Sequence, residues 1–162
     1  MFPHWVKDAF ATFAKGRNIK SMPRLKKIKQ EAWEYYNTWR QEKTYSPAFK
    51  SELKISLMGW RHISGATGYK KRTLHDTYRR LRLLPYAKEI IEKSTTIQNV
   101  TTKGKRTFYA LEAMIMVKEE DKEALRKVRV IFVEDTKGNK IFYSVMDKKQ
   151  KRVRKKSGTP HA

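Results

Sequence analysis

The sequence predicts an α+β fold in which N-terminal helices pack on a four-stranded antiparallel sheet. Three observations support this class. Apolar residues recur at spacings of three and four over the first half of the chain, which is the period of a helix. The second half contains apolar runs of strand length, separated by short turns that contain glycine. Helices followed by hairpins are typical of folds in which helices cover one face of an antiparallel sheet.

Two helices are predicted before residue 45. The first covers about residues 3–15 and ends at Gly16. The second begins at Pro23. Its apolar stripe consists of Leu25, Ile28, Ala32, Tyr35 and Trp39. We expect the stripe to pack within the molecule rather than in a coiled coil with a partner, because it spans only about two heptads.

Two further helices are predicted around Pro85. A basic helix over residues 70–83 directs three residues inward, namely Leu74, Tyr78 and Leu81. Pro85 ends this helix and starts a shorter one. The inward residues of the shorter helix are Ala87, Ile90 and Ile91.

Proline and charge patterns divide the chain into three parts. Pro47 marks a boundary near residue 46, so residues 1–45 are interpreted as a basic helical extension that is too short to be stable alone. Residues 46–148 form the predicted α+β domain. Residues 149–162 form a basic, flexible tail, since seven of the nine residues from Lys148 to Lys156 are basic. The alternating run Leu53–Leu57 indicates either a short strand or the approach to a turn at Gly59.

Four strands are predicted in the second half, at about residues 94–102, 105–118, 127–136 and 139–147. Tight turns at 103–104 and 137–139 separate paired strands, and residues 119–123 link the middle two with a helical turn. Both faces of the second strand are largely apolar, so we expect both to be covered over much of its length. Glu112 on this strand then needs a partner if it is buried.

The charge of the chain indicates a polyanionic partner. Lysine and arginine number 38 against 16 acidic residues, which gives a net charge of +22. Such a field attracts nucleic acid first, then an acidic protein or an anionic membrane. No apolar run approaches the ~18 residues of a membrane span. Lys7 and Asp8 stand where a secretory signal would be apolar, so we expect action in the cytoplasm of a cell, with no membrane partner.

Several chemistries have no support in the sequence. Cysteine is absent, which excludes disulfides and thiolate chemistry. Hard cations need converging carboxylates, and the one cluster, Glu119–Glu123, lies in a link between strands. There is no P-loop and no Gly-x-Gly-x-x-Gly run. We therefore predict no metal ligands and no cofactor.

His62 is the strongest candidate for proton transfer, because imidazole titrates near neutral pH and this one precedes a basic helix. The alternative is a packed or solvated histidine without a catalytic role. Metal-free RNA cleavage needs a group that takes the proton of the 2′-OH, a cation that stabilises the phosphorane, and a proton for the leaving oxygen. Candidates for the remaining roles are Lys103, Lys105 and Arg106 at the first hairpin, Tyr109, and Ser144.

These candidates also have structural interpretations. Lys105 and Arg106 could be charges that flank a turn, and Tyr109 could be a core residue. Ser144 interrupts the apolar run Ile141–Met146, where a hydroxyl either satisfies a local hydrogen bond or faces a ligand. His75 lies in the basic helix, where it is a surface residue or an RNA contact. The candidate RNA contacts are Arg61, Lys71, Arg72, His75, Arg79, Lys103 and Lys105.

Residues 50–148 resemble nucleases of the Barnase–EndoU–Colicin–RelE superfamily, in its phage-associated and polymorphic-toxin branches. The resemblance is carried by the run Ile55–Ile63, by Arg72, by the run Arg79–Pro85 and by the four predicted strands after them. It implies helices on a four-stranded antiparallel sheet and metal-free RNA cleavage, often of tRNA. It places catalytic groups at His62, Arg106, Tyr109 and Ser144. Many members carry a second histidine on the sheet; here an Arg, Lys or Tyr would take that role.

The predicted function is therefore a metal-independent endoribonuclease, the toxin of a toxin–immunity or phage-related system, which leaves 2′,3′-cyclic phosphate ends. Such a toxin needs an acidic immunity protein as its partner. A non-catalytic RNA- or ribosome-binding protein is the first alternative, since it explains the charge without a role for His62. A DNA-binding phage protein is the second.

Overall fold

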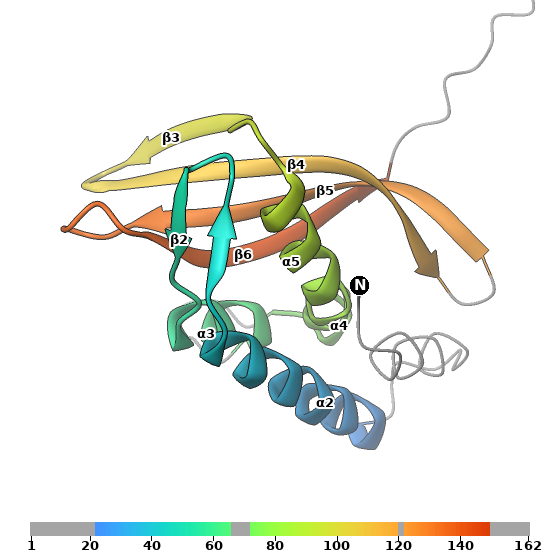
Figure 1. Ribbon diagram of the computed structural model, residues 1–162. Coiled ribbons are helices and arrows are strands. Elements are labelled where there is room, and N and C mark those ends of the chain that lie inside the picture. The colour runs from blue at the N-terminus through green and yellow to red at the C-terminus, as the bar shows by residue number, and fades with distance from the viewer. Residues whose placement is uncertain (1–21, 66–71, 120–121, 150–162) are drawn as a thin grey trace, which may run out of the picture.

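The computed structural model describes residues 22–65, 72–119 and 122–149, and it confirms the α+β class (Figure 1). Helices precede the main sheet along the chain. The elements are α2 (Met22–Gln41), β1 (Thr44–Ser46), β2 (Ser51–Leu53), α3 (Leu57–Ser64), α4 (Leu74–Arg82), α5 (Leu84–Lys93), β3 (Asn99–Lys103), β4 (Arg106–Glu119), β5 (Lys122–Glu134) and β6 (Lys140–Lys149). The helix expected over residues 3–15 and most of the basic tail lie outside the described residues.

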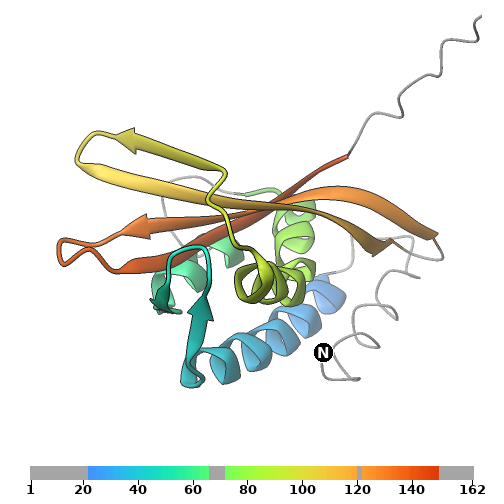
Figure 2. The same ribbon diagram turned by 45° about the horizontal axis from the view of Figure 1, so that its top comes forward.

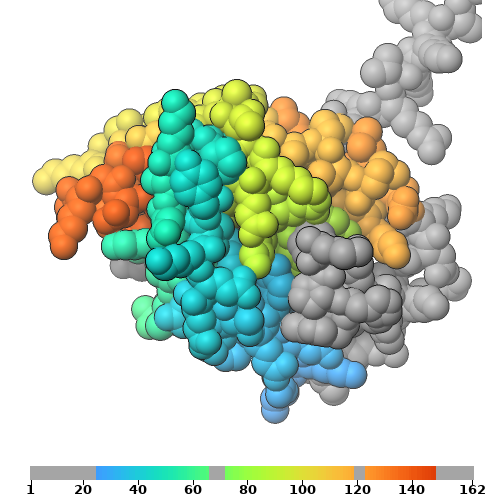
Figure 3. Space-filling model, viewed as in Figure 1, coloured from blue at the N-terminus to red at the C-terminus, as the bar shows by residue number. Residues whose placement is uncertain are grey.

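The main sheet is antiparallel with the strand order β3-β4-β5-β6, and the helices lie on one side of it (Figures 1 and 2). α5 packs under β4 and β5, α3 and α4 contact β6, and α2 packs on α3 and α4 as an outer layer. On this side the sheet is buried: Leu111 pairs with Val130, Val130 pairs with Val145, and all three are inaccessible to solvent. The small β1–β2 hairpin lies beside α5 (Figure 3).

The opposite face of the sheet is open at one end, which corrects the prediction that both faces of the second strand are covered. Met114 and Met116 on β4 and Leu125 on β5 are each about half exposed, at 48%, 51% and 48%. Glu112, between them and the centre of the sheet, is half-buried and has two cationic partners, as its position required. Its carboxylate lies 2.8 Å from Lys127 Nζ and 3.3 Å from Arg129 Nε.

The apolar stripe of α2 packs within the molecule, as expected. Its residues are all buried, and they belong to the same core cluster as Leu111, Val130 and Phe142 of the sheet. Trp39 and Tyr36 both contact the Phe142 ring, with centroid distances of 5.3 and 6.1 Å. Residues 22–41 and the sheet therefore share one core.

The short strand predicted over residues 53–57 is present only at its start, where Leu53 ends β2 and Lys54 bridges to Ile141, and the turn predicted at Gly59 is wrong. The strand is Ser51–Leu53, and residues 57–64 form helix α3, which ends at Gly65 in the left-handed conformation that suits glycine. Gly59 is therefore part of a helix and not of a turn. A Cβ on Gly59 would lie 2.6 Å from Tyr36 Oη and 2.7 Å from Phe142 Cδ1, so close approach to these two rings requires glycine.

The helices around Pro85 follow the prediction with one shift and one error. α4 begins at Leu74, after the N-cap residue Thr73 whose hydroxyl accepts from Asp76 N, rather than at residue 70. Leu74 is exposed and not inward, because it stands in the first turn. The other inward residues of both helices are buried, and Pro85 occupies the first turn of α5.

The hairpin turns were predicted in part. Gly104 and Gly138 adopt positive φ angles of 60° and 83° in the expected turns. A helical turn was expected at residues 119–123, but Glu119, Lys122 and Glu123 belong to the paired strands β4 and β5, while residues 120–121 lie outside the described residues. Within the described residues, no helix combines the length and the apolar character that crossing a bilayer requires.

Candidate active site

A cavity of about 500 Å³ lies on the sheet face that points away from α5. Its floor is a row of residues that are paired directly across all four strands: Asn99, Ala110, Ile131 and Ser144. Residues paired in this way share one face of a sheet. Its charged lining residues are all basic, namely Arg72, Arg80, Lys103 and Arg129 with the imidazole of His62, and no described carboxylate lines it. The cavity is therefore a concave site that favours an anion.

Arg80 and Ser144 form the polar centre of the cavity. Arg80 Nη1 donates to Ser144 Oγ at 2.6 Å and lies 3.4 Å from the carbonyl oxygen of Val145. Ser144 is fully buried on β6, while α4 carries Arg80 past the β6 edge of the sheet. A guanidinium and a hydroxyl held together in this way present donors to an anion in the cavity.

Arg72 joins His62 to this pair. Its Nε donates to the carbonyl oxygen of His62 at 2.9 Å, and its Nη2 lies 3.2 and 3.3 Å from the two ring nitrogens of His62. The tautomer of the ring decides which nitrogen accepts. The helix α3 ends two residues after His62, so the ring is held between the end of α3 and the start of α4.

Asp76, which does not line the cavity, binds the guanidinium groups of both Arg72 and Arg80. Its Oδ2 accepts from Arg72 Nη1 at 2.8 Å and from Arg80 Nε at 3.1 Å, which leaves Arg72 Nη2 and Arg80 Nη1 directed at His62 and Ser144. Burial alone would raise the pKa of Asp76, but its hydrogen bonds and ion pairs with the two arginines hold this pKa below its ordinary value. Asp76 is therefore ionised at neutral pH and fixes two cations in one geometry.

His62 is uncharged at neutral pH. Burial, together with the charges of Arg72 and Arg80, lowers the pKa of its imidazole to about 4, against a smaller opposing effect of the Asp76 carboxylate. Its ring stacks on Tyr143, with 4.1 Å between the centroids. A neutral imidazole can accept a proton, and an anion bound beside Arg72 and Arg80 would raise its pKa toward neutrality.

A β-bulge directs two neighbouring residues of β6 into the cavity. Ile131 pairs with Ser144, but Phe132 pairs with Phe142, so Tyr143 is an extra residue without a partner on β5. Successive residues of a regular strand point to opposite faces, yet Tyr143 and Ser144 both line the cavity. The bulge thus places the ring that supports His62 next to the hydroxyl that contacts Arg80.

The structure brings four predicted site residues together in this cavity: His62, Ser144, Arg72 and Lys103. Tyr109 is also at the wall, but its ring packs on Phe49 at 5.6 Å and its hydroxyl donates to Glu134 Oε2 at 3.3 Å. The register puts its side chain on the face opposite that of Ala110 and Ser144. Its hydroxyl is therefore not directed at the cavity.

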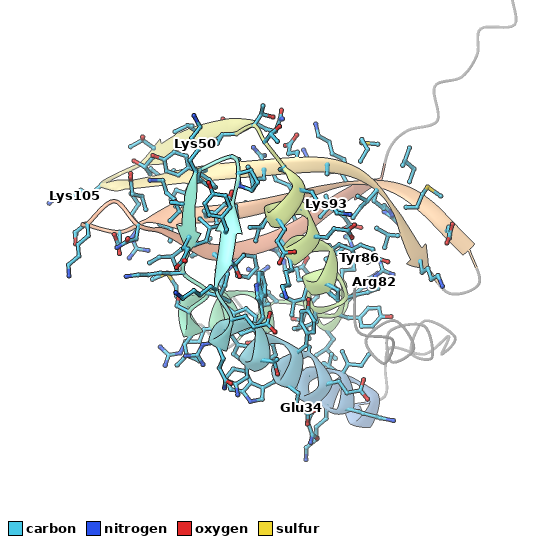
Figure 4. The ribbon with its side chains drawn as sticks, viewed as in Figure 1. Glu34, Lys50, Arg82, Tyr86, Lys93 and Lys105 are labelled. Atoms are coloured by element: carbon cyan, nitrogen blue, oxygen red, sulfur yellow. The ribbon has the colours of Figure 1, made fainter. Side chains whose placement is uncertain are left out.

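The remaining predicted residues lie elsewhere. Arg106 and Lys105 are exposed at the end of the β3–β4 hairpin, where Figure 4 shows Lys105 far from the helices. Arg79 pairs with Asp147, whose partner Val128 lies on the buried face of the sheet. Arg61 and His75 are exposed and do not line the cavity, and Lys71 lies outside the described residues.

Sequence reasoning missed Arg80, Asp76 and Tyr143. One signal was available, because Arg72, Asp76 and Arg80 follow each other at intervals of four residues and so share one side of a helical turn. The bulge that redirects Tyr143 has no such signal in the sequence.

The described residues contain no group of three or more His, Asp or Glu side chains that could hold a metal ion. Comparisons of the chain with protein families, curated proteins and solved structures found no match.

Proposed function

We propose that the protein is a metal-independent endoribonuclease that acts on RNA in the cytoplasm, with tRNA among its candidate substrates. One observation carries this proposal: a neutral imidazole, two guanidinium groups and a buried hydroxyl converge in one cavity whose charged lining is entirely basic. These are the groups that metal-free cleavage of a ribose–phosphate linkage requires.

The positions of these groups support the following reaction. His62 takes the proton of the ribose 2′-OH, and the 2′-oxygen forms a bond to phosphorus. Arg72 and Arg80 stabilise the negative charge of the phosphorane, and Ser144 orients a phosphate oxygen. The bond from phosphorus to the 5′-oxygen then breaks, and this oxygen takes a proton from Tyr143, from Lys103 or from water. The products are a 2′,3′-cyclic phosphate and a free 5′-OH.

The proposal is tested with total RNA in the presence of EDTA. We expect discrete cleavage by the parent and a loss of about 10²–10⁴-fold in rate for His62→Ala, the usual cost of a missing general base. His75→Ala is the matched control, since His75 is exposed outside the cavity, and it should cleave like the parent. Sequencing of the product ends should find cyclic phosphates. Equal rates for the parent and His62→Ala would refute the assignment.

A second function is favoured by one observation. Arg72 Nη2 already contacts the ring nitrogens of His62, and Tyr143 stacks on the ring. A histidine with only a structural role would make the same two contacts. On this alternative the protein binds RNA or the ribosome without cleaving it. RNA that is shifted in a gel but stays intact in the same assay would establish the alternative.

A role as a toxin would require a protein that inhibits the ribonuclease. An acidic immunity protein that inserts carboxylates between Arg72, Arg80 and Lys103 would match the charge of the cavity. The net charge of +22 should speed its capture, and the association rate should fall steeply with salt. A cognate inhibitor that is neutral or basic would contradict this partner.

A further inference from the structure

The two ends of the cavity differ in chemistry. At the β6 end lie Arg72, Arg80 and Ser144, which suit a phosphate. At the β3 end lie Asn99 and Thr101, which are exposed, line the cavity and form no side-chain hydrogen bond within the described part of the chain. Lys103 lies two residues beyond Thr101 on the same face of β3 and is the cation at this end. An amide and a hydroxyl with free donors and acceptors suit the edge of a nucleobase rather than a phosphate.

The side chains between these ends are apolar. Ala110 and Ile131 are the paired residues that separate Asn99 from Ser144. Phe108 borders them and packs edge-on against Tyr143, with 5.5 Å between the centroids. Neighbouring strands lie roughly 4.8 Å apart, so the three steps from β6 to β3 span roughly 14 Å. This span accommodates a phosphate at one end and a base at the other.

We propose that the cavity binds one unpaired nucleotide, with its phosphate at Arg72 and Arg80, its base on Phe108 and Ile131, and the edge of the base at Asn99 and Thr101. The inference rests on the proposed function for its substrate, and it adds that the substrate is single-stranded RNA and that Asn99 selects the base. A base inside a duplex cannot enter, because it is stacked and its pairing edge is occupied.

Binding of mononucleotides tests the site separately from catalysis. The full chain is titrated with inorganic phosphate, ribose 5-phosphate and the four nucleoside 3′-monophosphates, with calorimetry as the readout. We expect at least one nucleotide to bind about 10-fold or more tighter than ribose 5-phosphate, because contact of a base with an aromatic ring contributes about this much. We also expect the four nucleotides to differ from one another.

Variants assign these effects to the two ends. Asn99→Ala should reduce the differences between bases and leave the binding of inorganic phosphate unchanged. Arg80→Ala should weaken the binding of phosphate and of nucleotides alike. Thr102→Ala is the control, because Thr102 is an exposed residue of the same strand, and the alternation of the strand directs it to the opposite face from Thr101.

The inference would be overturned by nucleotides that bind no tighter than ribose 5-phosphate, or by base preferences that are the same in Asn99→Ala and the parent. Cleavage of a duplex as fast as of the same sequence in single-stranded form would also overturn it. Base-selective binding of nucleotides without cleavage of RNA would remove the proposed nuclease and keep the nucleotide site. Cleavage of RNA without any base preference would keep the proposed nuclease and remove the nucleotide site.

Discussion

At the scale of single residues, the site depends on one carboxylate that is not in the cavity. Asp76 Oδ2 contacts Arg72 and Arg80, and these contacts decide where the free donors of both guanidinium groups point. A group held by a fixed neighbour keeps its geometry when a substrate binds, and misplacement by about 1 Å can cost about 100-fold in rate. Asp76 is therefore a positioning residue.

Asp76→Asn keeps the size of the side chain but removes its charge. We expect RNA cleavage to fall by roughly 10–100-fold. Because the charge of Asp76 raises the pKa of His62, the acid limb of kcat/KM should also move to lower pH in this variant. Glu92→Gln, on the exposed side of α5, is the control. An unchanged pH profile with a reduced rate would point to a purely structural role for Asp76.

The pKa of His62 also predicts how stability depends on pH. Folding lowers this pKa from 6.5 to about 4, so between these values the unfolded chain binds more protons at this residue than the folded chain does. The contribution of His62 to the free energy of unfolding is therefore fully present above about pH 6.5, and it is lost as the pH falls toward 4. We expect the free energy of unfolding of His62→Gln to change less over this window than that of the parent, as measured by urea titrations at pH 4, 5, 6 and 7. Parallel curves for the two proteins would contradict a depressed pKa.

At the scale of elements, the helix α3 and the bulge in β6 decide where the site forms. α3 packs on β6 at Gly59, which lies against Phe142 of β6 and Tyr36 of α2. The residue after Phe142 is Tyr143, which the bulge places against the ring of His62. The packing of three elements therefore fixes the position of one imidazole. Such an arrangement depends on contacts between residues that are far apart in the sequence.

This dependence explains which elements the sequence could predict. The stripe of α2 and the strands of the main sheet follow from a regular apolar period, which is a local property. α3 is short, and its run of apolar residues around a glycine also fits a strand or a turn; the rings of Tyr36 and Phe142 decide in favour of the helix. His62 and Ser144 stood out by residue type, whereas Arg80 was one of many arginines and its partner Ser144 lies 64 residues away.

Gly59→Ala tests the contact between α3 and β6. In an exposed helix, alanine would be more stable than glycine by about 1 kcal/mol. Here the added methyl group would overlap Tyr36 Oη and Phe142 Cδ1, so we expect a loss of about 1–3 kcal/mol in the free energy of unfolding, measured by urea titration. Met58→Ala, on the exposed side of the same helix, should change it by less than about 0.5 kcal/mol. A more stable Gly59→Ala protein would show that α3 is not packed this closely.

At the scale of the whole molecule, charge is spread along the chain but is organised by the fold. The acidic residues near the cavity, Asp76 and Glu112, lie against arginines, and the cavity itself is lined by basic residues alone among those described. Composition predicted a polyanionic partner, yet it could not show where that partner binds, because a count of charges has no position. The sheet and α4 gather basic side chains around one cavity, and this is where we propose that the partner binds.

The salt dependence of RNA binding separates a defined site from a diffuse field. Each phosphate that a protein neutralises on a single strand contributes about −0.7 to the slope of log K against log salt concentration. We expect Arg80→Ala to reduce the magnitude of the slope for a single-stranded RNA by about this amount, with binding measured by fluorescence anisotropy in the His62→Ala background so that the RNA stays intact. Lys93→Ala removes the same charge from α5, where Lys93 pairs with Glu89 on the helical side of the sheet (Figure 4), and should leave the slope unchanged. If both variants reduced the slope equally, RNA would be held by the overall charge of +22, and the cavity would have no special part in binding.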